Sequence, residues 1–247
     1  MEEDLDEWYW FEGEDENEEE AEACLPCIET KRKLFLDKFQ DAIIKWARLH
    51  ENELLNYRSY RWKHATYEES VKMRNELEEI ITISRKRNDG GLGLHVLDRI
   101  YQWGFGKDFP LRNEQYILKI TKKAFKYLDQ GNCYNACRTL MQMKGVGVAG
   151  ATKILGLSNQ NRFCIYDSRV GKALKDLQKD ERKIIRCPPG RCIKGDYIPY
   201  ERWDHEWALN YQKLIWTLEI IRDCLKEKDP NLRVADIEMA LFMKGRS

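Results

Sequence analysis

Apolar residues recur at steps of three and four along most of the chain, and this spacing constrains the fold more than any other feature. Between Lys31 and Tyr57 the apolar positions are Leu34, Phe35, Phe39, Ile43, Trp46, Ala47 and Leu54. A stripe of this kind is typical of an amphipathic helix with one face on a core. No segment shows the alternation of apolar and polar residues that a half-buried strand requires. The sequence therefore predicts an all-α fold.

Helix boundary signals divide the chain further. Thr66 and Glu69 form a capping box ahead of a second helix, which ends in the basic loop 85–91. We expect further helices at 92–103, 113–128, 133–143, 148–155, 203–226 and 234–243, and one that starts at Asp167. Residues 178–200 are rich in Pro, Gly and basic residues, so we expect irregular structure there.

Charge is distributed unevenly along the chain. Of the 42 Asp and Glu, thirteen lie in residues 1–22, which hold none of the 42 Lys and Arg, so residues 23–247 carry a formal net charge of +13. A basic body with an acidic tail is typical of a polyanion-binding protein, with nucleic acid as the leading partner. We expect residues 1–30 to be a disordered acidic tail that folds back on the binding face, and residues 31–247 to be one helical domain. The alternative is that the tail only increases solubility.

Composition argues against a membrane protein and an exported one. Mean hydropathy is −0.69, and no run reaches the roughly 18 apolar residues of a spanning helix. The acidic start MEEDLDEWYW is unlike a secretory leader. We expect an intracellular monomer, in the cytoplasm, nucleoid or nucleus, whose eight cysteines are reduced.

The segment 140–155, LMQMKGVGVAGATKIL, holds the most informative motif. Gly145 and Gly147 flank Val146 between two predicted helices, which permits a tight turn and lets backbone amides approach a phosphate. Lys144 is expected to contact the same phosphate, and the turn is a candidate site for a monovalent cation. The alternative is that this glycine turn serves helix packing alone.

The segment 163–170 adds a carboxylate at a fixed distance from the glycine turn. It is an apolar run in which Asp167, twenty residues after Gly147, begins a predicted helix. The pattern resembles the helix-hairpin-helix DNA glycosylase superfamily, nearest to its 8-oxoguanine glycosylase-like branch. The resemblance implies a two-lobed helical fold with the hairpin at 133–155 and the catalytic aspartate segment at 163–175. It assigns Asp167 as the catalytic carboxylate; the alternative is an ordinary helix N-cap.

The resemblance also implies an activity on double-stranded DNA without a redox cofactor. A damaged base is flipped out of the duplex and its glycosidic bond is hydrolysed, which leaves an abasic site. Bifunctional members carry a Schiff-base lysine where this chain has Ala149, so we expect a monofunctional glycosylase without strand cleavage. Lys153, one helical turn further on, is an alternative amine.

Several alternatives remain open at this level. The expected substrate is an oxidised base, as in DNA repair, and the alternative is a bulky modified base of viral DNA, as in anti-phage defence. A different class altogether is a non-catalytic helix-hairpin-helix module that only binds DNA.

Other residues are assigned by type and position. Additional DNA contacts are expected from Arg87, Asn88, Lys153 and Arg169, with the basic stretch Lys183, Arg186, Arg191 and Lys194 as a further candidate. The base pocket is expected among Trp103, Phe105, Trp203, Trp207, Tyr211 and Trp216. Cys24, Cys27, Cys187 and Cys192 form a loose four-thiolate pattern, but the pairs are so far apart in sequence that we expect no zinc.

Overall fold

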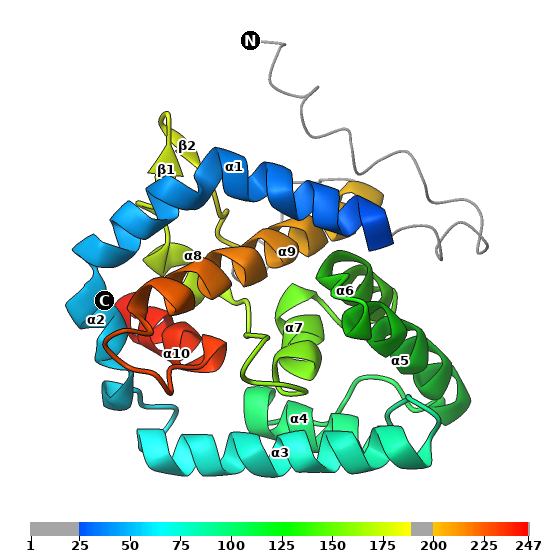
Figure 1. The fold of residues 1–247 in the computed structure, drawn as a ribbon. Helices are drawn as coiled ribbons and strands as arrows, with labels where there is room; N and C mark the ends of the chain where they lie inside the picture. The colour runs from blue at the N-terminus through cyan, green and yellow to red at the C-terminus, as the bar shows by residue number, and fades with distance from the viewer. Residues whose placement is uncertain (1–24, 189–199, 247) are drawn as a thin grey trace.

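The structure is a computed structural model that describes residues 25–188 and 200–246, and side chains for 28–188 and 204–246 (Figure 1). The acidic tail up to Cys24 lies outside these residues, as do Arg191, Cys192 and Lys194. The side chains of Cys27 and Trp203 lie outside them too, so the expectations for these positions stay predictions.

The described chain is mostly helical, which confirms the all-α prediction. Its helices are α1 (Leu25–Leu49), α2 (Glu51–Leu55), the 3-10 helix η3 (Tyr57–Ser59), α3 (Tyr67–Arg87), α4 (Leu94–Phe105), α5 (Glu114–Asp129), α6 (Cys133–Met141), α7 (Val148–Gly156), α8 (Ser168–Ala173), α9 (Tyr200–Leu225) and α10 (Val234–Lys244). No described helix has the length and apolarity to cross a bilayer.

Two local expectations were wrong. Residues 25–30 were assigned to the disordered tail but belong to α1. Within the stretch expected to be irregular, β1 (Gln178–Lys179) and β2 (Arg182–Lys183) pair in antiparallel register. Asp180 and Glu181 make their connection with positive φ angles of 51° and 63°, which is the backbone of a tight two-residue hairpin turn.

Short polar side chains fix where several helices begin. The capping box of Thr66 and Glu69 is present at the start of α3. Asn113, Asn132 and Asp167 accept hydrogen bonds from the first free amides of α5, α6 and α8. These caps satisfy donors that have no acceptor within the helix.

The helices pack in pairs around α7 (Figure 1). Helix α1 runs along α9, α5 lies against α6, and α3 lies against α4, while α7 contacts α4, α6 and α9. Helix α10 packs on α8, α9 and η3. Most of α7 is therefore buried, and only its N-terminal end and the turn before it reach the surface.

Candidate functional site

The hairpin, defined here as α6, the turn 142–147 and α7, has the backbone that the glycine pattern predicts. Gly145 adopts φ +83°, and a Cβ there would lie 3.1 Å from the ring of Pro110. Val146 is buried between the helices, whereas Lys144 and Gly147 are exposed. Gly147 is the N-cap of α7 and supplies no side-chain cap, so the first amides of α7 are free to face an anion.

Thr152 connects this hairpin to the segment that carries Asp167. Its hydroxyl donates to the Val148 carbonyl at 2.8 Å and accepts from the buried Tyr166 amide at 3.0 Å. Gly156 allows the returning chain to pass closely, because a Cβ there would lie 2.6 Å from the Cys164 carbonyl oxygen. The residue before Asp167 is thus fixed directly to α7.

Asp167 is half-buried at the start of α8. Its Oδ1 accepts from the amides of Arg169 at 2.9 Å and Val170 at 3.1 Å. The N-cap interpretation of this residue is therefore confirmed. Both cap bonds are made to Oδ1, so the cap does not use the second carboxylate oxygen and is compatible with the predicted catalytic role.

Lys153 lies in the interior, with 4% of its surface exposed. Its side chain fills the space left by Gly104, where an added Cβ would lie 2.6 Å from its Cδ. Its ammonium lies 4.5 Å from the centroid of the Phe105 ring. Burial lowers the pKa of Lys153 to about 8, opposed by the charges of Asp167 and Glu238. The expected role as a surface phosphate contact does not fit this position.

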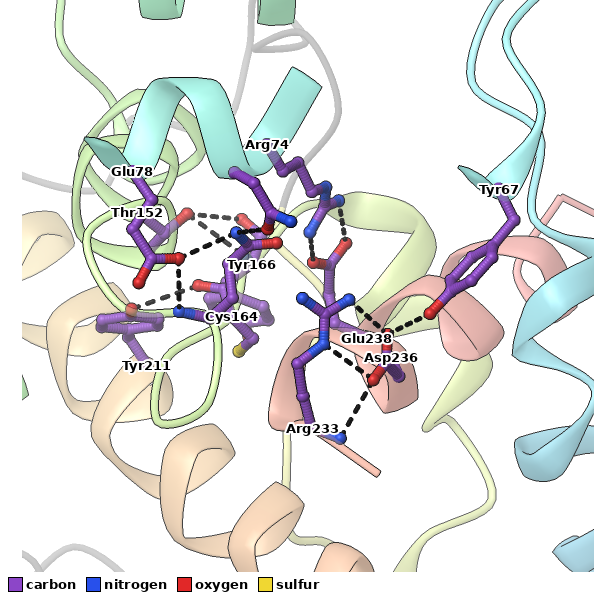
Figure 2. A network of polar contacts seen from close by, with 12 residues as sticks. Tyr67, Arg74, Glu78, Thr152, Cys164, Tyr166, Tyr211, Arg233, Asp236 and Glu238 are labelled. Atoms are coloured by element: carbon purple, nitrogen blue, oxygen red, sulfur yellow. Dashed lines mark hydrogen bonds and ion pairs between the residues drawn. The ribbon is translucent and has the colours of Figure 1, made fainter. Parts of the chain in front are cut away.

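A buried ion pair lies beside Lys153. The guanidinium of Arg74 on α3 donates to both carboxylate oxygens of Glu238 on α10, at 2.7 and 3.2 Å, and each side chain is 2% exposed. Figure 2 shows this pair together with Asp236, which binds both Tyr67 and Arg233. The pair joins α3 to the C-terminal helix α10, and its two charges neutralise each other.

An aromatic cluster, formed by Trp62, Trp103 and Phe242, lies against these charges. Trp62 is 5.9 Å from Trp103 and 5.4 Å from Phe242 between ring centroids. Arg74 lies over Trp103 at 5.4 Å, and Arg169 lies over Phe242 at 4.7 Å. Among the described residues, the buried indole N–H groups of Trp62 and Trp103 have no hydrogen-bond partner. The cluster therefore contacts Arg74 and Arg169 and includes the residue before Gly104, against which Lys153 packs.

The other predicted pocket residues are divided between site and core. Trp103 and Phe105 lie at the end of α4 beside Lys153. Trp207 and Trp216 are 6% exposed and Tyr211 is fully buried, donating to the Cys164 carbonyl at 3.1 Å. These three side chains of α9 form core: Trp216 packs on Phe35 of α1, with ring centroids 5.3 Å apart, whereas Trp207 and Tyr211 face the segment before Asp167.

The loop expected to probe DNA lies elsewhere. Asn88 caps the end of α3 and donates to Ser84 at 3.1 Å, and Arg87 is exposed. The following residue, Asp89, pairs with Lys122 of α5. The structure thus brings this loop to α5, and no contact among the described residues joins it to Asp167.

Of the four cysteines in the loose thiolate pattern, for which no zinc was expected, Cys187 alone has a described side chain. Cys187, the described member, is exposed and donates its thiol to the Ser168 carbonyl at 3.3 Å. Within the described residues, no group of three or more His, Cys, Asp or Glu side chains is arranged to hold a metal ion.

Sequence reasoning missed Trp62, Arg74, Glu238 and Phe242. One signal was present: Arg74 occupies the buried stripe of α3 that also holds Ser70, Leu77 and Ile81. A charged residue on an apolar stripe predicts a buried partner, but nothing in the sequence identifies Glu238 as that partner.

Comparisons with models of known protein families, with curated proteins and with solved structures find no match. The interpretation of this site therefore depends on the residues and their geometry.

Proposed function

We propose that the protein is a DNA N-glycosylase with Asp167 as its catalytic carboxylate and the hairpin as its grip on the DNA backbone. The observation that carries the proposal is the link through Thr152, whose hydroxyl joins α7 to Tyr166. A backbone phosphate bound at the start of α7 would then lie at a fixed position relative to Asp167. Glycosidic bond cleavage needs this register between the DNA strand and the carboxylate.

The proposed reaction is hydrolysis. The bond between the base and C1′ breaks, its electron pair leaves with the base, and C1′ becomes cationic. Asp167 stabilises this charge, and a water molecule adds its oxygen to C1′ and gives up a proton. The product is an abasic site. The proposal includes the two-lobed arrangement of the helix-hairpin-helix glycosylases, in which the active site lies between the lobes.

The flipped base requires an apolar surface on which to stack. We assign the aromatic cluster and Phe105 to this role, since stacking on aromatic rings recovers part of the cost of unstacking a base. An oxidised base is the first substrate to test, and a bulky modified base the second.

The test is base release by the native protein and by Asp167→Asn. Free bases from undamaged, oxidised, alkylated and hypermodified duplexes are measured by mass spectrometry. Loss of the carboxylate charge should reduce release at least about a hundredfold, while the Kd for DNA stays within a few-fold. Asp176→Asn, at a surface aspartate after α8, is the control. No base release by the native protein, despite tight DNA binding, would favour the non-catalytic module.

A further inference from the structure

Lysine side chains follow one side of α5 at helical spacing. Residues three or four positions apart lie on the same side of a helix, and four lysines have this spacing. All four are exposed: Lys119, Lys122, Lys123 and Lys126. The stripe extends over about 10 Å of the helix axis, so its ammonium groups form a linear array on the surface.

The basic end of α3 adjoins this stripe. Lys86 and Arg87 are exposed there. The preceding residue, Arg85, donates to Asp129 at the end of α5 at 2.6 Å and lies over the ring of Phe125 at 4.4 Å. In Figure 1 the end of α3 and α5 lie together at the right edge of the fold. The two helices therefore present their cations on one surface.

The loop that follows α3 is fixed against α5 by backbone contacts. The amide of Leu92 donates to the hydroxyl of Thr121 at 2.8 Å. A Cβ at Gly91 would lie 2.8 Å from the carbonyl oxygen of Leu118, so a glycine permits this close approach. The fold thus sets the position of the basic end of α3 relative to α5.

Residues 85–90 and 119–129, named the basic face here, hold seven Lys and Arg against two Asp, a formal net charge of +5. Both aspartates are paired with cations of the same face, Arg85 and Lys122. Every exposed residue of the two segments is charged. Protein interfaces are depleted in lysine and depend on apolar anchors, whereas Lys and Arg neutralise phosphates. The basic face therefore suits a nucleic-acid backbone better than a protein.

We infer that the basic face binds the phosphate backbone of duplex DNA, as a contact separate from the hairpin and independent of base sequence. Phosphates of one strand follow each other every 3.4 Å or so along the duplex axis, so a stripe of about 10 Å matches three of them. Helix α5 packs on α6, whereas Asp167 caps α8, which packs on α10. The inference goes beyond the proposed function, because a DNA-binding module without catalysis would have the same face.

The test compares two variants of the full-length protein that each lose three positive charges. The face variant replaces three lysines of the stripe: Lys119→Gln, Lys123→Gln and Lys126→Gln. The control variant replaces three exposed lysines of α1 and α3: Lys33→Gln, Lys45→Gln and Lys72→Gln. Glutamine is nearly as good a helix former as lysine, and thermal unfolding verifies that both variants fold.

The Kd is measured for a random-sequence duplex of about 30 base pairs, roughly 100 Å long, between about 50 and 200 mM salt. The slope of log Kd against log salt should fall by about 2 to 3 in the face variant, since each phosphate contact contributes about 0.9. Its Kd at the lowest salt should weaken at least about tenfold, and the slope of the control should fall by less than about 1. Bound DNA should also protect the three stripe lysines of the native protein from acetylation.

Equal slopes in the native protein and the face variant would overturn the inference, as would equal losses in the two variants. Carbodiimide cross-linking of the free native protein, which joins lysine amines to carboxylates, tests the acidic segment 1–22 as a different occupant. Cross-links from the stripe to that segment, together with an unchanged slope in the face variant, would assign the face to the tail and contradict DNA binding. Weaker DNA binding by the face variant, without base release from any DNA by the native protein, would support this inference while contradicting the proposed glycosylase.

Discussion

At the scale of single residues, Lys153 shows how little a side chain's type says about its role. The sequence places a lysine one turn into a short helix, where most lysines are exposed. The structure places it against Gly104 and Phe105, with a lowered pKa. Burial of this ammonium lowers the free energy of unfolding of the protein, because it removes the water that solvates the charge.

Lys153→Met should stabilise the protein at pH 7, and less so as the pH rises. The pKa of Lys153 is about 8 in the folded chain, against 10.5 for an ordinary lysine. Between these values the unfolded chain holds a proton that the folded chain has released, so stability of the native protein increases with pH. The difference in the free energy of unfolding between the two proteins should fall from about 3 kcal/mol at pH 7 toward zero as the pH rises above 10.

Urea unfolding of native protein and Lys153→Met at pH 7 and pH 10 measures this change. The groups that face Lys153, namely Asp167, Glu238, Arg74 and Arg169, are present in both proteins, so the difference reports on the lysine. Lys144→Met serves as the control, since its lysine is exposed. A difference that does not change with pH would contradict the prediction.

At the scale of elements, the nine residues of α7 make three kinds of contact. Its N-terminal amides face solvent, Thr152 holds the segment before Asp167, and Lys153 faces α4. Thr152 and Lys153 can contact different parts of the fold, because consecutive residues of a helix point in directions about 100° apart. One helix therefore carries the glycine turn at its N-terminal end, fixes the segment before Asp167 and buries Lys153 against α4.

Thr152→Val should reduce both stability and base release. The substitution keeps the shape of the side chain but leaves the buried Tyr166 amide without its acceptor. An unsatisfied buried amide costs about 1–3 kcal/mol, and the loss frees the backbone just before Asp167.

Thr82→Val is the matched control, because Thr82 makes the same type of bond to the Glu78 carbonyl on an exposed face of α3. Its stability should change by no more than about 0.5 kcal/mol. Urea unfolding and single-turnover base release measure both variants. Equal losses in the two would show that the Tyr166 contact has no special role.

At the scale of the whole molecule, the Arg74–Glu238 pair connects two residues of α3 and α10 that lie 164 positions apart in the sequence. In Figure 1, α3 runs along the bottom of the view and α10 lies above its left end. The pair and the neighbouring Tyr67–Asp236 hydrogen bond of 2.9 Å hold the C-terminal helix to α3. Such a pair adds specificity to the packing more readily than net stability.

Arg74→Met should destabilise the protein by about 3–5 kcal/mol, because it leaves Glu238 buried without a partner. Arg74→Met combined with Glu238→Leu should recover most of that loss. The control is Arg112→Met, which breaks an exposed pair with Asp98 and should cost less than about 1 kcal/mol. Chemical unfolding of the native protein, Glu238→Leu and these three variants tests this, and additive effects of the two core substitutions would contradict it.

The sequence by itself determined the local features of this protein. Helix periodicity, the Thr66 capping box, the tight turn at Gly145 and the cap at Asp167 all depend on neighbours within a few residues. Such interactions act within a single element, so a sequence pattern is enough to predict them. The two errors, at residues 25–30 and at the β1–β2 hairpin, lie where such local signals are weak.

The tertiary structure alone decided the composition of the candidate site. It buried Trp207 and Tyr211 in the core, moved the Asn88 loop to α5, and buried Lys153 against Gly104 and Phe105. It also joined Arg74 to Glu238. These outcomes depend on which helix faces meet, and an amphipathic pattern shows that a face is buried without showing against what.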